Sequence, residues 1–200
     1  MRLPYAPSTP PADSPSSVAE IYSRIAARRK PRPLIPLDLT LLHSPPVASG
    51  YNAFVGALRT ETVVPQSTLE LAICRVAILT DAVYEWNIHA ALALKAGVTG
   101  QALSIVWSAP KGMVQDEEEG LGKKEVAVLR YTDEMTVDVK VKDATFDDLR
   151  QHFNDREVLE LTTVVAGYNA VSRILVSLDV GENNAKKMKT VEELEGELKG

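Results

Sequence analysis

The residue types best suited to acid/base chemistry lie close together in one stretch, Tyr84-Glu85-Trp86-Asn87-Ile88-His89. On an α-helix Glu85 and His89 share a face, because residues four positions apart are neighbours there. A carboxylate beside an imidazole favours the protonated ring and orients it, which tunes a general acid or base. The other interpretation is an ordinary surface pair, which contributes about 0.2–0.5 kcal/mol and is common on helices.

A second carboxylate, Glu70, precedes this stretch and also has two interpretations. Ser67-Thr68-Leu69-Glu70 matches a capping box, in which the glutamate accepts a hydrogen bond from the backbone amide of the first residue. Glu70 could equally belong to the acid/base group. The two roles exclude each other only if both carboxylate oxygens are consumed.

Five further residues could bind a ligand or serve the core. Arg75 interrupts an apolar run, and a buried arginine needs an anionic partner, either a protein side chain or a substrate carboxylate. Asn169 and Arg173 form an i, i+4 polar pair on an otherwise apolar helix, with the same two explanations. Tyr84 and Trp86 could line a pocket for an unsaturated or aromatic ligand, or could simply pack.

The bulk composition narrows the class of protein. With 200 residues and 45% hydrophobic content, the chain can form one domain with its own core. The single cysteine, Cys74, excludes an intrachain disulfide and a Cys-x-x-Cys pair. A net charge of −5 without a basic stripe makes nucleic acid an unexpected partner. Neither a spanning segment nor a signal peptide is evident, so we expect a soluble, cytoplasmic protein without a membrane partner.

The elements that must position these residues are helices. Apolar residues recur at helical spacing between capping and proline signals, and no segment has a partner strand, which predicts an all-α domain of about eight helices. The main expected helices cover 17–29, 46–60, 67–80, 82–97, 101–108, 123–135, 145–153 and 155–178. Residues 136–141 alternate valine with polar residues, and we expect an extended loop there. Residues 111–122, which include an acidic run, are expected to form an exposed loop.

The predicted organisation has three parts. Residues 1–15 are rich in proline and serine and should form a flexible arm, or one that lies on a neighbouring subunit. Residues 16–181 form the helical domain, and residues 182–200 form a charged terminal helix and tail. The tetrapeptide Gly-Tyr-Asn-Ala occurs at both 50–53 and 167–170. Chance and a duplicated helical hairpin both explain this repeat.

Three segments resemble the carboxymuconolactone decarboxylase family, which includes the alkylhydroperoxidase D-like (AhpD-like) proteins. Residues 69–77 (LELAICRVA) look like the family's first central helix. Residues 84–89 (YEWNIH), followed by 96–99 (AGVT), look like its second. Residues 166–173 (AGYNAVSR) resemble a late helix of the family. The resemblance covers residues 45 to 180 and implies the family's all-helical fold.

The resemblance also has consequences for chemistry. Hydroperoxidase members carry a glutamate, a Cys-x-x-Cys pair and a histidine in fixed register, and Glu70 and His89 stand 19 positions apart, as that register requires. The two cysteine positions fall on Ala82 and Glu85, so thiol-based peroxide reduction should be absent. What remains is an acid/base set, and the branch it resembles uses no metal or organic cofactor.

These observations predict a cofactor-independent enzyme that decarboxylates or isomerises a small unsaturated or lactone-type carboxylate. His89 would be the general acid/base, oriented by Glu85 or Glu70. An arginine would hold the substrate carboxylate. The expected substrate-binding residues are Arg75, Tyr84, Trp86, Asn169 and Arg173.

Two alternatives stay open. The chain could be a catalytically decayed family member that acts as a binding module or structural oligomer, or, less in keeping with its residues, an antioxidant hydroperoxidase. The family's members are trimers or hexamers with sites near subunit contacts, so the resemblance implies a homo-oligomer. It would also explain an N-terminal arm with nowhere to pack on its own subunit.

Overall fold

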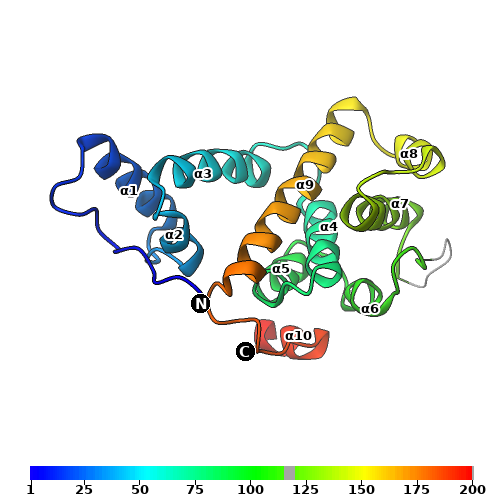
Figure 1. The fold of residues 1–200 in the computed structure, drawn as a ribbon. Helices are drawn as coiled ribbons and strands as arrows, with labels where there is room; N and C mark the ends of the chain where they lie inside the picture. Colours follow the sequence, from blue (N-terminus) through cyan, green and yellow to red (C-terminus); the bar gives the residue numbers. More distant parts are fainter. Residues whose placement is uncertain (115–119, 200) are drawn as a thin grey trace.

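The computed structural model describes residues 1–114 and 120–199, and these form ten α-helices, one π-helix and no β-strand (Figure 1). The all-α prediction is confirmed. The helices are α1 (Ser16–Arg29), α2 (Pro36–Leu41), α3 (Pro45–Thr60), α4 (Gln66–Leu79), α5 (Val83–Lys95), α6 (Gly100–Ser108), α7 (Lys123–Asp133), the π-helix η1 (Glu134–Asp138), α8 (Asp143–Arg150), α9 (Asp155–Leu178) and α10 (Val191–Lys199).

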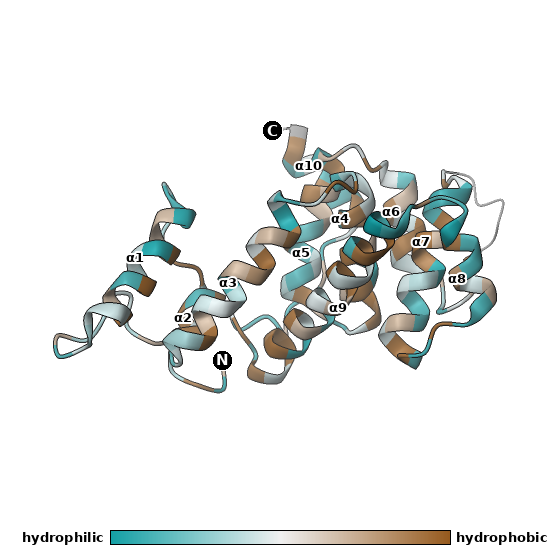
Figure 2. Ribbon diagram, turned by 90° about the horizontal axis from the view of Figure 1, so that it is seen from above, coloured by the Kyte–Doolittle hydropathy of each residue, from teal (hydrophilic) through white to brown (hydrophobic). Residues whose placement is uncertain are grey.

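Helix α4 is the centre of the bundle. Every residue from Thr68 to Ala77 is buried, as expected for a helix that is apolar nearly all round. Its neighbours are α5, α6, α7 and α9, which surround it in Figure 1. Figure 2 shows the hydrophobic residues of α4, α6, α7 and α9 gathered in the middle of the bundle, while hydrophilic residues dominate the outer side of α8.

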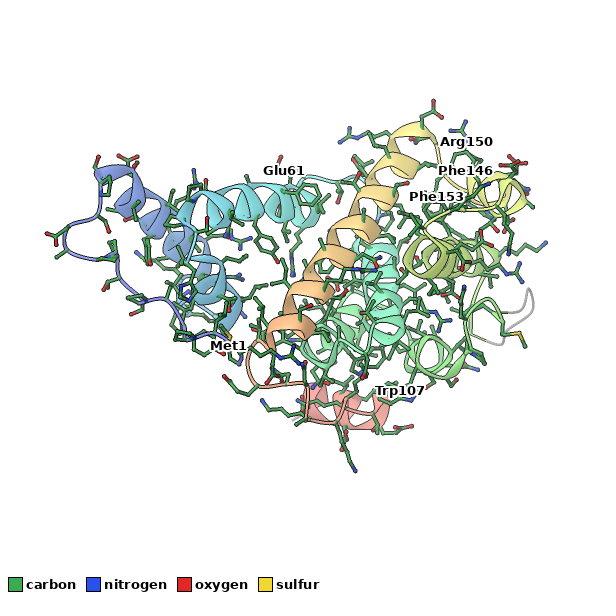
Figure 3. All side chains as sticks on the ribbon, viewed as in Figure 1. Met1, Glu61, Trp107, Phe146, Arg150 and Phe153 are labelled. Carbon is green, nitrogen blue, oxygen red and sulfur yellow. The ribbon has the colours of Figure 1, made fainter. Side chains whose placement is uncertain are left out.

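Helices α1 to α3 project to one side of this bundle (Figure 1), and the N-terminal segment returns along their lower edge. The Met1 ammonium donates to Asp179 at 3.4 Å and to Glu182 at 3.1 Å, and Figure 3 shows Met1 at the end of α9. Ala6 is buried, and its amide donates to the Leu39 carbonyl. The expectation of an arm that finds no packing on its own subunit is therefore wrong, because backbone hydrogen bonds and terminal charge hold it to the same chain.

The first residues of the helices show which of the predicted capping residues form their hydrogen bonds. Thr99 caps α6, its hydroxyl accepting from the Ala102 amide at 3.1 Å. Asn154 and Glu157 form a reciprocal capping box at the start of α9, one residue before the expected cap. The predicted capping box at Ser67 does not form: Pro65 occupies the cap position of α4 and no side chain caps it.

The prediction of an extended loop at 136–141 is wrong for residues 136–138. Glu134–Asp138 continues α7 as a π-helix, in which each turn takes one more residue than in an α-helix. The turn ends at Val139, whose φ of 65° lies in the left-handed region. Buried Thr136 faces α9, which explains why a segment with strand-like alternation is helical here.

Helix α9 has the length and apolar composition to cross a membrane, the one described helix of which this is true. Its apolar residues serve the core instead: Leu161, Val164 and Val165 are buried, and the helix packs on α3, α4 and α5. Residues 115–119 of the predicted acidic loop lie outside the described residues.

Candidate active site

The most chemically capable contact of the molecule joins α4 and α5. His89 Nδ1 donates to Glu70 Oε2 at 2.6 Å, and both side chains are buried. Asp81, in the left-handed region at φ 52°, makes the tight connection that turns α5 back along α4. Small buried residues such as Ala77 and Ala90 let the two helices approach closely. Glu70 therefore orients the imidazole and does not cap its own helix.

Glu85 lies beside this pair without bonding to it. The side chain is 1% exposed, and neither carboxyl oxygen has a hydrogen-bond partner among the described residues. Burial, and then the nearby carboxylate of Glu70, raises the pKa of Glu85 well above its ordinary value. The raised pKa favours the protonated form of Glu85, and that form can donate a proton. Of the two carboxyl groups expected to orient His89, Glu70 makes the hydrogen bond.

Two tyrosines, Tyr168 from α9 and Tyr51 from α3, lie within reach of this group. The rings of Tyr168 and His89 meet edge to face, with centroids 4.8 Å apart. The Tyr168 hydroxyl and Asn52 Oδ1 are buried, and neither has a hydrogen-bond partner among the described residues. Burial, and then the carboxyl group of Glu85, raises the pKa of Tyr51. The group therefore combines two phenolic hydroxyls with the buried Glu70–His89 hydrogen bond and the carboxyl group of Glu85.

Sequence reasoning missed Tyr168 and Tyr51 as members of this group, and it also missed the buried oxygen of Asn52 that has no partner among the described residues. A signal was present in the repeated tetrapeptide: Tyr51-Asn52 comes from its first copy and Tyr168 from its second. Both copies lie in helices that pack against each other and contribute to one centre. In the sequence alone, the repeat indicates a duplication or chance and does not predict a site.

Arg75 is fully buried and holds the bundle together. Its guanidinium pairs with Asp133 on α7, at 2.5 Å from Nε and 2.9 Å from Nη2. The remaining donors reach the carbonyl of Val106 in α6 and those of Ala109 and Pro110 just after it. This is the structural one of the two roles considered, because the contacts leave the guanidinium no donor for a substrate carboxylate.

Trp86 and Tyr84 contact parts of the protein other than the Glu70–His89 pair. Trp86 is fully buried, packs edge to face on Trp107 with centroids 5.0 Å apart, and donates from Nε1 to the Lys189 carbonyl at 2.8 Å. Tyr84 is half-buried against the Gly181 turn. Both residues pack against protein, Trp86 by tying the C-terminal segment to α5.

Asn169 and Arg173 do form the predicted pair on α9. Arg173 donates to the Asn169 side-chain oxygen at 2.7 Å, while the Asn169 amide donates to Thr136 in η1 at 3.0 Å. Arg173 is exposed. These contacts link α9 to the π-helix, and nothing in them brings Arg173 to the Glu70–His89 pair.

The thiol of Cys74 is fully buried on α4. Burial, and then the carboxyl groups of Glu70 and Glu85, raises its pKa well above the ordinary value. A thiol in such surroundings is a weak nucleophile, because the thiolate is the reactive form. The chain has no second cysteine with which it could form a disulfide.

Comparison with known proteins places this geometry in a fold class. An uncharacterized peroxidase-related protein from Ralstonia eutropha JMP134, described as an alkylhydroperoxidase AhpD core, has 18% identity and a TM-score of 0.70, with 90% of each chain covered. A peroxidase-related protein from Silicibacter sp. TM1040 has 14% identity and a TM-score of 0.65, covering 91% of this chain and 95% of that one. An Agrobacterium tumefaciens protein of unknown function, with a suggested AhpD antioxidant-defence role, has 20% identity and a TM-score of 0.61 over 68% and 90% of the two chains.

The fold is thus the AhpD-like fold. Residues 45–122, which hold Glu70, Glu85 and His89, match the model of the carboxymuconolactone decarboxylase family. The resemblance drawn from the sequence is confirmed, for a chain without a Cys-x-x-Cys pair. None of the curated proteins matches this chain.

Proposed function

We propose that the chain is a cofactor-independent acid/base enzyme that decarboxylates or isomerises a small unsaturated or lactone-type carboxylate. The observation that carries this proposal is the buried Glu70–His89 hydrogen bond of 2.6 Å beside the unpartnered carboxyl group of Glu85. A core without a function for Glu85 would gain from an apolar residue there, since an unsatisfied buried polar group costs about 1–3 kcal/mol.

The roles follow from the contacts. Glu70 accepts from Nδ1 of His89 and leaves Nε2 as the ring nitrogen that exchanges a proton with substrate. The carboxylate also stabilises the imidazolium when Nε2 is protonated. Glu85, whose pKa is raised by burial and by Glu70, would be a second proton donor within the same group.

The proposed reaction can be balanced with these groups alone. In decarboxylation the bond to the carboxylate carbon breaks, CO2 leaves, and the electron pair passes into the conjugated carbonyl as a dienolate. The His89 imidazolium or the Glu85 carboxyl protonates a carbon of the dienolate, and solvent restores that proton. Isomerisation and lactone opening pass through similar enolate-like species, so the same residues could serve them.

The decisive experiment is a screen of small lactones and unsaturated diacids in D2O with the wild-type chain and His89→Gln. We expect turnover with deuterium incorporated at carbon for the wild type and loss of both for the variant. His152→Gln is the matched control, because this histidine lies outside the site. Turnover unchanged in His89→Gln would refute the assignment and favour the alternative of a decayed binding or structural protein.

We also propose that the chain assembles into a trimer or hexamer. Large hydrophobic side chains are exposed on α3 and α9, where Phe54 is 45% and Leu159 66% exposed. A contiguous apolar patch marks a contact between proteins, whereas a single exposed residue is ordinary, so these two residues support the proposal only if they share one patch. Light scattering of the full chain measures the mass, and a monomer at micromolar concentration would contradict this proposal.

A further inference from the structure

The buried polar group has an unmet hydrogen-bonding capacity of a particular kind. Glu85, Tyr168 and Asn52 are 1%, 2% and 8% exposed, and each has at least one side-chain oxygen without a partner among the described residues. When protonated, the carboxyl group of Glu85 supplies one O–H donor and the Tyr168 phenol a second, while the Asn52 amide oxygen supplies an acceptor. Such a set suits an uncharged oxygen, such as a ketone, lactone or enol oxygen. It does not suit a carboxylate, which needs a cation when it is desolvated.

Neither Arg75 nor Arg173, the two cations that the sequence suggests, is available to bind a substrate carboxylate. Arg75 is committed to Asp133 and three carbonyls, and Arg173 is exposed and bonded to Asn169. A carboxylate substrate therefore requires another cation close to the same residues. Helix α3, which contains Asn52, also contains such a cation, Arg59.

Arg59 stands seven residues after Asn52 on α3, and this spacing puts both residues on one face of the helix with Val55 between them. Arg59 is half-buried, and its guanidinium has no hydrogen bond or ion pair with any residue that the structure describes. Helix α3 also approaches α9 closely at Gly167, where an added Cβ would lie 2.9 Å from Leu58 Cδ1. Leu58 precedes Arg59 and Gly167 precedes Tyr168, so the close approach brings these two segments together.

The electrostatics agree with that placement. Burial raises the pKa of Tyr168, the guanidinium of Arg59 opposes this effect, and the carboxyl groups of Glu70 and Glu85 add to it. The Tyr168 hydroxyl is therefore within electrostatic reach of both Arg59 and the carboxyl groups of Glu70 and Glu85.

We propose that Arg59 binds the anionic group of the substrate, while Tyr168, Asn52 and Glu85 bind an uncharged carbonyl oxygen deeper in the protein. The substrate class is then a small carboxylate with a ketone or lactone carbonyl at its other end. This inference rests on the proposed function for its chemistry. It adds Arg59 to the proposed site. Arg59 takes the place of Arg75 and Arg173 as the carboxylate-binding group.

A binding experiment tests the proposal without turnover. The probe is 5-oxotetrahydrofuran-2-acetate, a saturated lactone acid that cannot form a dienolate, and its uncharged methyl ester is the matched ligand. Calorimetry with the full-length wild-type chain should show the acid binding at least about tenfold more tightly than the ester, as expected for a charge-assisted hydrogen bond.

The variants separate the two parts of the site. Arg59→Gln should abolish the preference for the acid, and Arg59→Lys should restore part of it. Tyr168→Phe should weaken both ligands by a similar factor and leave the ratio intact. Arg173→Gln is the control and should change neither ligand. Circular dichroism and light scattering of each variant check that fold and mass are retained.

Several results would overturn the inference. One is a wild-type chain with no preference for the acid. Another is an Arg59→Gln variant that keeps the preference, or an Arg173→Gln variant that loses it. A change of mass in Arg59→Gln with binding intact would assign Arg59 to a contact between subunits. If Arg59 controls binding while His89→Gln keeps full turnover, the inference stands and the proposed acid/base role fails.

Discussion

The carboxylate of Glu70 and the imidazole of His89, 19 positions apart in the sequence, meet at 2.6 Å between two helices in the core. By the resemblance drawn from the sequence, the same two residues fall on the glutamate and histidine positions of the hydroperoxidase register, and Glu85 falls on one of its cysteine positions. The chain thus has a proton-transfer pair without a redox pair. The predictions below test the consequences of this arrangement.

Loss of either member of the pair should be equally damaging to catalysis. On a substrate found by the screen, Glu70→Gln and His89→Gln should each lower kcat by about 10²–10⁴-fold, the contribution typical of a positioned acid/base. The double variant should be little worse than either single one, because the two act as a unit. Steady-state kinetics measures this, and additive losses would show that the residues act separately.

Glu85 should make stability fall as pH rises. Its pKa is raised by folding, so the folded protein binds more protons than the unfolded one at any pH between the ordinary value of 4.5 and the raised value. Stability is then greatest below 4.5 as far as this group is concerned, and it declines above that pH. The urea midpoint of the wild type should therefore fall between pH 5 and pH 8. In Glu85→Gln, whose amide is neutral at every pH, the part of this fall that comes from Glu85 should be absent. An unchanged slope would mean that Glu85 is ionised in the folded protein.

The buried Arg75–Asp133 pair should be costly to break. Asp133→Asn leaves the Arg75 charge in the core without a counter-charge, which should lower the free energy of unfolding by about 3–5 kcal/mol. Arg156→Gln is the matched control: it breaks an ion pair with Glu160 in which Arg156 is 62% exposed, and should cost at most about 1 kcal/mol. Urea denaturation compares the two. Equal losses would contradict a special role for the buried pair.

Cys74 should be chemically silent in the native protein. Its buried thiol should react with a thiol reagent only on unfolding, and Cys74→Ala should retain full turnover on any substrate of the wild type. Peroxide consumption should be absent from both proteins. Peroxide reduction that disappears in Cys74→Ala would restore the antioxidant alternative.

Most of the fold could be predicted from local signals. Proline positions, Thr99 and the apolar spacing of α3 and α9 each act within a few residues, and the helices begin close to where these signals lie. The π-helix could not be predicted, because its extra residue per turn leaves no separate mark in the pattern of Thr136 to Val141. Its helical form depends on contacts with α9.

The site was predicted where the register of a known family fixed it and missed elsewhere. Glu70 alone was ambiguous, since a capping box and a catalytic pair use the same residue type. Arg75 was ambiguous because its partner, Asp133, lies 58 positions away. The sequence does not predict a binding role for Arg59, because a basic residue in the last turn of a helix is ordinarily explained by the helix dipole.

A protonated carboxyl group at Glu85, the form that its raised pKa favours, would give the protein an intrinsic spectroscopic label. A protonated carboxylic acid absorbs in the infrared at a frequency separate from that of ionised carboxylates, and further from the amide bands. Because this acid is buried and has no hydrogen-bond partner among the described residues, its band should be narrow and should disappear in Glu85→Gln. Ligand entry, hydrogen bonding and deprotonation would each move that band differently, so events inside a closed core could be followed in solution without attaching a dye.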